Sequence, residues 1–259
     1  ALAEAEPLMG KLFQFRFEEN SALSGHSFGN LFITAMSKVT GDFAQAIKES
    51  SKVLAIRGSV LPSTFEKITL VAEHRDGTQT IGERNISKKH SAIKEVFLKP
   101  NDCKANEEAI KDIKNSDAII LGPGSLYTSV LPNLLVGGIK EAIAKAKTLK
   151  IYICNVMTQP GETDNFKASD HLKALIEHAG FNIITSCIVN TEKIPEGLIA
   201  KYREEGAYLV IPDKERIKEL GYKYIGANVV STQDFVRHDS RKLAKLIYDT
   251  IMDYKKKNG

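Results

Sequence analysis

From residue 106 onward, segments with apolar residues at helical spacing alternate with short apolar runs. The helical spacing predicts helices over residues 106–114, 134–146 and 168–179, and a last amphipathic helix over residues 243–254. The short runs predict strands over residues 118–121, 151–154 and 183–189, with further strand material at residues 208–211 and 228–230. This alternation is typical of a parallel sheet with helices on both faces, so the sequence predicts an α/β fold.

Residues at the ends of two predicted helices have the chemistry of caps. Gly180 stands where a C-cap glycine belongs after the helix over residues 168–179, and Ser169 or Asp164 is its expected N-cap. Asp239 or Ser240 is the expected N-cap of the last helix.

Between residues 53 and 98 the pattern changes to alternation with a period of two. Asp76 and Gly77 lie between two strand-like runs, which is a strong signal for a hairpin turn. The expected strands cover residues 53–57, 68–73, 78–83 and 93–98. We therefore expect a small antiparallel β subregion within residues 53–98.

The first fifty residues are predicted to be mostly helical. Residues 6–17 have the pattern of a helix end, and the uniformly apolar segment over residues 31–39 predicts a buried helix. Residues 42–50 predict another helix. The chain opens inside a helical pattern without Met, so we expect a fragment or a numbering that omits an N-terminal part. Since no long linker interrupts the chain, a single domain over residues 1–259 is expected.

The composition narrows the class of protein without pointing to a chemistry. The chain has 259 residues, 42% hydrophobic and 26% charged, which is ordinary for a globular protein with a sizeable core. Its net charge of +4 comes from Lys and Arg spread along helices, so no nucleic-acid partner is expected. There is no apolar run of about 18 residues, no secretion signal and no metal-type spacing of Cys103, Cys154 and Cys187. These features favour a cytoplasmic protein with reduced thiols and no membrane span.

A glycine- and hydroxyl-rich loop over residues 122–129 is the first candidate for chemistry. It follows a predicted strand directly, and ligands of such sheets bind beyond the carboxyl ends of the strands. Its glycines let backbone approach a ligand closely, and its N–H groups and hydroxyls can surround an anion. A tight turn with a helix cap is the other interpretation. The candidate ligand residues here are Gly122, Pro123, Gly124, Ser125, Tyr127, Thr128 and Ser129.

Two further loops have similar composition. The loop over residues 155–164 either binds a ligand or caps the next helix, and its Glu162 and Asp164 alone do not establish acid–base or metal chemistry. The loop over residues 24–30 opens a helix whose free N–H groups favour an anion, although a lone histidine such as His26 is more often a structural hydrogen-bonder. The candidates in these loops are Asn155, Thr158, Gly161, Glu162, Thr163, Asp164, Gly25, His26, Ser27, Gly29 and Asn30.

Arg237, shortly before the last helix, is a weaker candidate. Arginine suits bidentate phosphate binding, but near a helix start it is usually a surface charge. Several motifs are absent: the P-loop, the third glycine of the Gly-x-Gly-x-x-Gly fingerprint and the Gly-x-Ser-x-Gly of serine hydrolases. No metal site is proposed, because the histidines lack Cys or carboxylate partners at metal spacing.

Three motifs taken together resemble a known family. They are Ser-Gly-His-Ser-Phe-Gly-Asn at residues 24–30, Ile-Ile-Leu-Gly-Pro-Gly-Ser-Leu-Tyr-Thr-Ser at residues 119–129 with Leu-Pro-Asn-Leu-Leu at 131–135, and Asn-Val-Met-Thr-Gln-Pro-Gly-Glu-Thr-Asp at residues 155–164. In this order they are similar to the bacterial gluconeogenesis-factor (YvcK-like) proteins, within the superfamily of 2-phospho-L-lactate transferases (CofD-like). The resemblance runs from about residue 1 to the final helix.

The resemblance implies a cytoplasmic, Rossmann-like protein that binds a nucleotide or nucleotide sugar, with UDP-sugars first. It also implies a link to growth on gluconeogenic carbon and to cell-shape and wall maintenance. The three loops would line the site, and Arg237 would meet the ligand's phosphates. The glycine-rich strand–loop–helix with which the family opens is missing here, so we expect the loop over residues 122–129 to be the secondary cradle.

Two functions follow from this resemblance. The first is a regulatory protein that senses a nucleotide sugar and acts through protein partners, either alone or as a homo-oligomer. The alternative is a transferase of the 2-phospho-L-lactate type, which would need Mg²⁺ and for which Glu162 and Asp164 are the acidic candidates. No residue is assigned a catalytic role.

Overall fold

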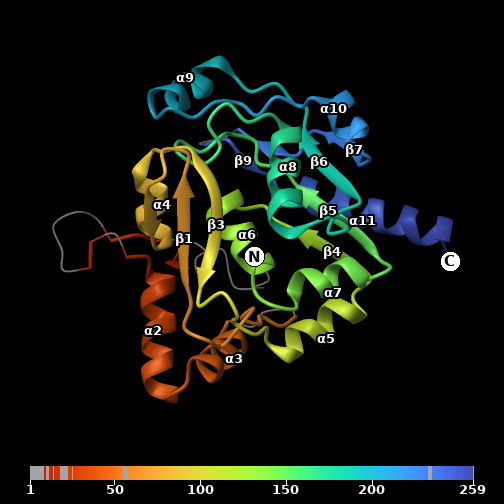
Figure 1. The fold of residues 1–259 in the computed structure, drawn as a ribbon. Coiled ribbons are helices and arrows are strands. Elements are labelled where there is room, and N and C mark those ends of the chain that lie inside the picture. Colours follow the sequence, from red (N-terminus) through yellow and green to blue (C-terminus); the bar gives the residue numbers. More distant parts are fainter. Residues whose placement is uncertain are drawn as a thin grey trace. The chain divides into compact units, whose positions relative to one another are not determined.

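The computed structural model describes residues 9, 12–13, 15–17, 23–24, 26–54, 58–232 and 235–258. The chain contains two compact units, residues 1–65 and residues 66–259. Figure 1 follows their helices and strands along the sequence.

The first unit contains two helices in contact with each other, α2 (Phe28–Thr40) and α3 (Phe43–Val53). Ser27 caps α2, because its Oγ accepts a hydrogen bond from the Asn30 N–H (3.2 Å), and Asp42 caps α3 in the same way. The predicted burial of the apolar helix is wrong: no residue of α2 is buried, and Val39 is 82% exposed. A contact between two helices covers one stripe of each, so uniform apolar composition does not by itself bury a helix.

The other predictions for this unit hold in part. The helix expected over residues 42–50 is confirmed but continues to Val53, so the strand expected from residue 53 is wrong at its start, and residues 55–57 lie outside the described part. Residues 15–17 are extended rather than helical, and Arg16 forms a β-bridge with Ser27. Residues 9, 12 and 13 are helical, and the remaining positions of the expected helix end lie outside the described residues.

The second unit contains the predicted antiparallel subregion as a three-stranded sheet. Its strands are β1 (Thr69–His74), β2 (Gln79–Ile81) and β3 (Ile93–Lys99), in the order β2-β1-β3. The predicted hairpin turn joins β1 to β2, and Asp76 closes it by accepting hydrogen bonds from the N–H and hydroxyl of Thr78. The sequence pattern misses α4 (Glu83–Lys89), which ends the predicted second strand early. Ile86 is the buried residue of α4, and a seven-residue helix with little apolar periodicity leaves a weak signal.

The predicted parallel sheet is confirmed in the same unit. Its four strands are β4 (Ala118–Leu121), β5 (Leu149–Ile153), β6 (Ser186–Asn190) and β7 (Lys223–Ala227), side by side in chain order. The pattern misses β7 because Lys, Tyr and Gly interrupt its apolar residues. Residues 208–211 are not a strand of the sheet. Leu209 makes a single antiparallel bridge to Met157, in the loop beyond β5.

Helices connect and follow these strands. They are α5 (Glu107–Asn115), the π-helical turn η1 (Leu126–Val130), α6 (Leu131–Leu134), α7 (Ile139–Lys145), α8 (Ala168–Ala179), α9 (Glu196–Glu204), α10 (Lys214–Glu219) and α11 (Ser240–Asn258). A two-stranded ribbon of β8 (Val230–Ser231) and β9 (Arg237–His238) lies between β7 and α11 in the chain. None of the helices in the described part is long and apolar enough to span a bilayer.

The helix predicted over residues 134–146 is interrupted. Residues between α6 and α7 leave the helix because the Gly137 N–H donates to the Cys103 carbonyl (3.0 Å) and its own carbonyl accepts from the Ala105 N–H. A Cβ atom at residue 137 would lie 2.9 Å from the Cys103 oxygen, so this pairing requires glycine. The sequence pattern shows the apolar periodicity across the break but not the partner 34 residues upstream.

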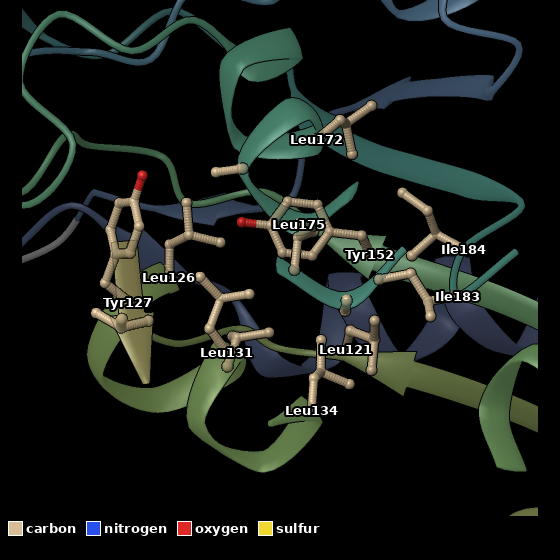
Figure 2. Packing of buried hydrophobic residues seen from close by; sticks show 14 of the residues in the cluster. Leu121, Leu126, Tyr127, Leu131, Leu134, Tyr152, Leu172, Leu175, Ile183 and Ile184 are labelled. Atoms are coloured by element: carbon tan, nitrogen blue, oxygen red, sulfur yellow. The ribbon is translucent and has the colours of Figure 1, made fainter. Parts of the chain in front are cut away.

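The two faces of the parallel sheet bury different helices. Side chains such as Leu121 and Tyr152 point to the face covered by α6 and α8, in the cluster that also contains residues of the antiparallel sheet. Figure 2 shows Tyr152 in the middle of this cluster, surrounded by side chains from neighbouring elements. Ile151 and Ile153 point to the opposite face and pack with Leu243 of α11. Period-two alternation in β5 thus gives both faces an apolar core, as the α/β prediction requires.

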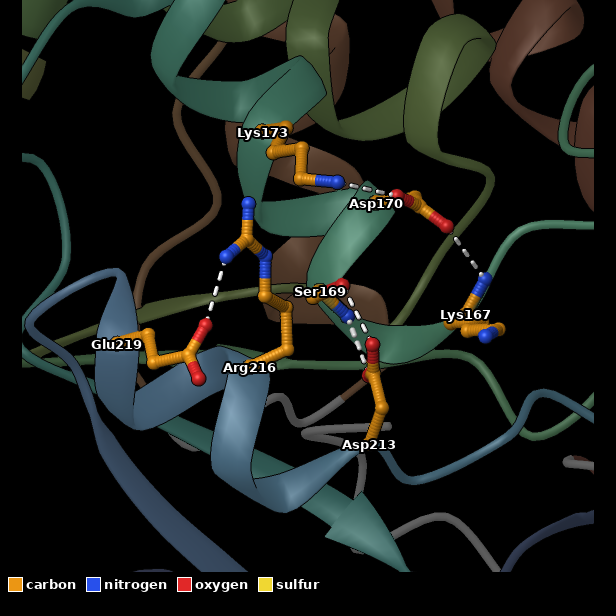
Figure 3. Close-up of polar contacts among 7 residues, drawn as sticks. All are labelled: Lys167, Ser169, Asp170, Lys173, Asp213, Arg216 and Glu219. Carbon is orange, nitrogen blue, oxygen red and sulfur yellow. Dashed lines mark hydrogen bonds and ion pairs between the residues drawn. The ribbon is translucent and has the colours of Figure 1, made fainter.

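The N-cap predicted for α8 is wrong, whereas its C-cap is confirmed. α8 begins after Lys167, whose N–H donates to the Asp170 carboxylate (3.0 Å). Ser169 lies inside the first turn, where its N–H and hydroxyl donate to Asp213 at 2.9 Å and 2.6 Å, as Figure 3 shows. The helix ends at Gly180, which has a positive φ of 85°.

The cap predicted for the last helix is confirmed. Asp239 Oδ1 accepts hydrogen bonds from the N–H groups of Arg241 and Lys242, each at 3.0 Å. The helix extends beyond the predicted bounds to Asn258.

A histidine is enclosed in the core between β5 and α8. His171 is 0% exposed, and its Nδ1 lies 3.0 Å from the hydroxyl of Tyr152, which is also fully buried. Its Nε2 is buried without a hydrogen-bond partner in the described part of the chain. Burial lowers the pKa of the imidazole to about 4, because the charged form loses its hydration.

We predict that His171 makes the protein less stable below neutral pH. The unfolded chain takes up a proton near pH 6.5 and the folded chain only near pH 4, so stability is lost as the pH falls through this window. Between pH 7 and pH 5 the loss from this group should be about 2 kcal/mol. Urea unfolding at both pH values measures it. His171→Met removes the titrating group, so its stability should fall less over the same interval, and equal losses in both proteins would contradict the prediction.

Candidate functional site

The carboxyl ends of the parallel strands form the edge where the predicted loops emerge. Residues 122–129 follow β4 and residues 155–164 follow β5. A pocket of about 280 Å³ opens at the same edge, lined by residues 155–156 after β5, residues 189–193 at the end of β6 and residues 209–212. The sequence does not predict that residues 189–193 and 209–212 line a pocket, because these segments carry no glycine-rich motif.

The loop after β4 lies close to the end of β5. Gly122 has a positive φ of 89°, and a Cβ atom there would lie 3.2 Å from the Ile153 carbonyl oxygen. Pro123 and Ser129 are exposed, whereas Tyr127 and Thr128 are buried at the start of η1. The Tyr127 ring packs edge-on against Phe166 and His178, and burial raises its pKa to about 12. Gly124 packs against Ser129 within the loop.

A chain of side-chain hydrogen bonds joins the two loops. The Asn155 amide donates to Gln159 Oε1 (3.2 Å), and Gln159 Nε2 donates to Ser125 Oγ (2.6 Å). The Gln159 main-chain N–H donates to Thr163 Oγ1 (2.9 Å). Gln159 was not among the predicted site residues, and nothing in its local sequence distinguishes it, because Ser125 is 34 residues away.

Glu162 is buried between three segments. Its carboxylate is 4% exposed and accepts hydrogen bonds from Thr128 Oγ1 (3.2 Å) and from Ser87 Oγ of α4 (3.2 Å). Burial raises its pKa, and the hydrogen bonds from Ser87 and Thr128 oppose that shift. Glu162 therefore acts as an internal acceptor that ties α4 and the β4 loop to the β5 loop.

The other predicted residues of the β5 loop also make internal contacts. Thr158 is 3% exposed, and its Oγ1 accepts from the Tyr208 N–H (2.9 Å). The exposed Asp164 accepts from the Gly161 N–H (2.8 Å). The loop following β5 is thus held by its own polar residues, and Asn155 is the predicted residue that also lines the pocket.

The predicted residues 24–30 belong to the first compact unit. Ser27 and Asn30 form the N-cap of α2, Gly29 packs its backbone against Phe13, and His26 is exposed. Gly25 lies outside the described residues. Their proposed role in a ligand site stays a prediction.

Arg237 lies in β9, paired with Ser231 of β8. Its side chain is exposed. The imidazole of the neighbouring His238 lies close to the backbone of Cys154, the residue after β5, and burial lowers its pKa. This contact places β9 at the carboxyl end of β5, next to the loop over residues 155–164.

The acidic pair does not form a ready magnesium site. Both oxygens of Glu162 lie within hydrogen-bond distance of Thr128, and desolvation disfavours its ionised form. Asp164 already accepts from a backbone N–H. In the described residues, no three His, Cys, Asp or Glu side chains form a group suited to hold a metal ion. The residues present therefore do not fit a metal held by Glu162 and Asp164.

Comparison with known proteins places this arrangement in a family. Residues 1–230 match the family model for 2-phospho-L-lactate transferase CofD. The chain belongs to this family. Within it, the chain is similar to the gluconeogenesis factor of Halalkalibacterium halodurans, at 50% identity over 96% of this chain and 78% of that protein. It is also 46% identical to the gluconeogenesis factor of Bacillus subtilis, over 98% of this chain and 80% of that protein.

A solved structure supports the fold of this CofD-family chain. An X-ray crystal structure of a Bacillus halodurans protein matches with a TM-score of 0.89 at 49% identity, covering 95% of this chain and 80% of that one. The resemblance to gluconeogenesis factors and the fold class predicted from the sequence are thereby confirmed.

We predict that Gly161 is required for the loop to pack against α4. Its φ is +80°, and a Cβ atom would lie 2.5 Å from the Cα of His90, so Gly161→Ala combines backbone strain with a collision. Gly41→Ala is the matched control: φ is +73°, but nothing lies within 4 Å of the added carbon. The free energy of unfolding should fall by about 1–2 kcal/mol for the control and by at least about 1 kcal/mol more for Gly161→Ala. If urea unfolding gives equal losses of stability for the two variants, the loop can move away from His90 at no cost in free energy, which contradicts the prediction.

Proposed function

We propose that this chain is a regulatory protein that binds a nucleotide sugar, a UDP-sugar first, at the carboxyl edge of its parallel sheet. Binding there would act as a regulatory signal in the cytoplasm during growth on gluconeogenic carbon. Through protein partners, it would also support maintenance of cell shape and of the cell wall. The names of its relatives support the link to gluconeogenesis.

The observation that supports this proposal most is the hydrogen-bonded chain from Ser125 to Asn155. It runs from the hydroxyl-rich loop after β4 to a residue that lines the pocket of about 280 Å³. A loop with hydroxyls and backbone N–H groups suits a phosphate, and an adjacent concave pocket suits an uncharged ring. Carboxyl ends of parallel strands are the usual place for such ligands. The exposed guanidinium of Arg237 comes from β9, beside the same edge.

A Mg²⁺-dependent transferase is the second candidate, and the family model's description favours it. The internal use of Glu162 weighs against it, because a metal would have to compete with Ser87 and Thr128 for that carboxylate. Incubating UDP-glucose with the protein and Mg²⁺ tests the difference: unchanged nucleotide sugar favours sensing, and turnover favours transfer.

We predict that UDP-glucose stabilises the protein more than GDP, GTP, ADP or NAD does in a thermal-shift panel. At 100 times its dissociation constant, a ligand that binds only the folded state adds about 2.7 kcal/mol. For a chain of this size the melting temperature should rise by a few degrees. If no nucleotide in the panel shifts the melting temperature, both proposed functions fall.

Arg237→Ala should then weaken the binding of UDP-glucose about tenfold, which is equivalent to about 1.4 kcal/mol of binding free energy. Arg241→Ala is the matched control, because Arg241 is also exposed but lies in the first turn of α11. Isothermal titration gives both dissociation constants. Equal affinities of the two variants for UDP-glucose would contradict a role of Arg237 in binding.

A further inference from the structure

Gln159 uses both ends of its side-chain amide on neighbouring polar groups. Its Oε1 accepts from Asn155, and its Nε2 donates to Ser125 Oγ over a short 2.6 Å. Gln159 thereby decides which hydrogen-bonding groups of its two neighbours are left over for a ligand.

On the Ser125 side, a donor is left over. A serine hydroxyl has one hydrogen to give, and here its oxygen already accepts from Gln159. Ser125 is partly exposed, and within the described residues its hydroxyl hydrogen has no acceptor. The hydroxyl therefore presents a donor, which complements a phosphate oxygen.

On the Asn155 side, one donor and one acceptor are left over. The amide gives one of its two N–H groups to Gln159 and retains the other together with its carbonyl oxygen. Asn155 lines the pocket at the ends of β5 and β6. A neighbouring donor and acceptor complement a neutral group that offers the same pair, such as vicinal sugar hydroxyls or the imide edge of a pyrimidine.

The backbone of Gln159 is held firmly. Its N–H donates to Thr163 Oγ1, and its carbonyl accepts from the N–H groups of Glu162 and Thr163 at 3.0 Å and 2.9 Å. Thr163 is 0% exposed and Glu162 is 4% exposed, so these anchors are shielded from water. A side chain fixed this way orients its partners before a ligand arrives, which reduces the entropy cost of binding.

We propose that Gln159 is a positioning residue that sets the polarity of one continuous site. It turns the Ser125 hydroxyl toward a phosphate oxygen of the ligand and the Asn155 amide toward a neutral ring in the pocket. This inference rests on the proposed nucleotide-sugar function and adds the placement of the ligand: phosphate at the loop after β4, and ring between the ends of β5 and β6.

A double-mutant cycle on Ser125 and Gln159 tests the proposal, with the dissociation constant of UDP-glucose as the readout. Ser125→Ala should weaken binding about tenfold, as expected for one hydrogen bond to a charged group. Gln159→Met should cost several-fold more in the natural background than in the Ser125→Ala background, where its effect on Ser125 is already lost and only its effect on Asn155 remains. A merely structural role would give losses that multiply, and that result, like full affinity of Gln159→Met, would overturn the proposal.

Two further variants serve as a control and as a replacement in this experiment. Gln79→Met in β2 removes an exposed glutamine that belongs to neither loop and should leave the dissociation constant unchanged. If Gln159→Met does not fold, Gln159→Asn replaces it in the same cycle: it keeps a neutral amide but is one methylene too short to reach both partners, so it should weaken binding by a similar factor in the natural background.

The ring in the pocket is identified by comparing UDP-glucose with UDP in Asn155→Ala. Loss of affinity for UDP-glucose alone places the sugar in the pocket, and equal loss for both places the uracil there. No loss for either ligand contradicts the proposed placement. Failure of the unmodified protein to bind any nucleotide would refute the proposed function itself, whereas binding with multiplying losses refutes only the role of Gln159.

Discussion

The buried carboxylate of Glu162 holds together the loops at the carboxyl edge of the parallel sheet. It accepts hydrogen bonds from Thr128 in the loop after β4 and from Ser87 in α4, while its own backbone belongs to the loop after β5. Taking a carboxyl group out of water is costly, and an unpaired one would destabilise the fold by several kcal/mol or take up a proton. The hydroxyl donors offset that cost only while all three segments stay in register. The close approach of Gly161 to His90 is the steric counterpart of this polar link.

This link divides the polar residues of the loops into two groups. Thr128, Thr158, Glu162 and Thr163 are buried and bonded within the protein. Ser125 and Asn155 are partly exposed and keep unused hydrogen-bonding capacity. The first group explains why the loops need so many hydroxyl-bearing residues even before any ligand is considered. The second group is small, and a small number of well-placed polar groups is what a selective pocket requires.

The sequence predicts those parts of the fold that depend on local periodicity. β4, β5, α5, α8 and the antiparallel hairpin are recognisable because apolar spacing and turn residues are local signals. The break before α7 and the bonding of Ser169 in the first turn of α8 depend on Cys103 and Asp213, which lie 34 and 44 residues from Gly137 and Ser169. Such partners are set by the fold and cannot be read from spacing.

The candidate site shows the same limit. Composition directs attention to the loops after β4 and β5, where glycines and hydroxyls are dense, and the structure joins these two loops through side-chain hydrogen bonds. Composition does not separate Glu162, a buried internal acceptor, from Asn155, which faces the pocket, because both stand in one motif. Nothing local marks Gln159 in that motif, because its partner Ser125 lies 34 residues away in the sequence.

The burial of Glu162 also bears on the choice between sensing and transfer. Members of one family share a fold, but their chemistry depends on the groups left free at the site. For Glu162 to ligate a metal, the buried hydroxyl of Thr128 would lose its acceptor, at about 1–3 kcal/mol, whereas the exposed Ser87 could turn to water. Binding a phosphate through Ser125 needs no such rearrangement, since its hydroxyl hydrogen has no acceptor among the described residues. The loop architecture of this chain therefore favours the proposed sensing function over a metal assembled around the acidic residues of the β5 loop.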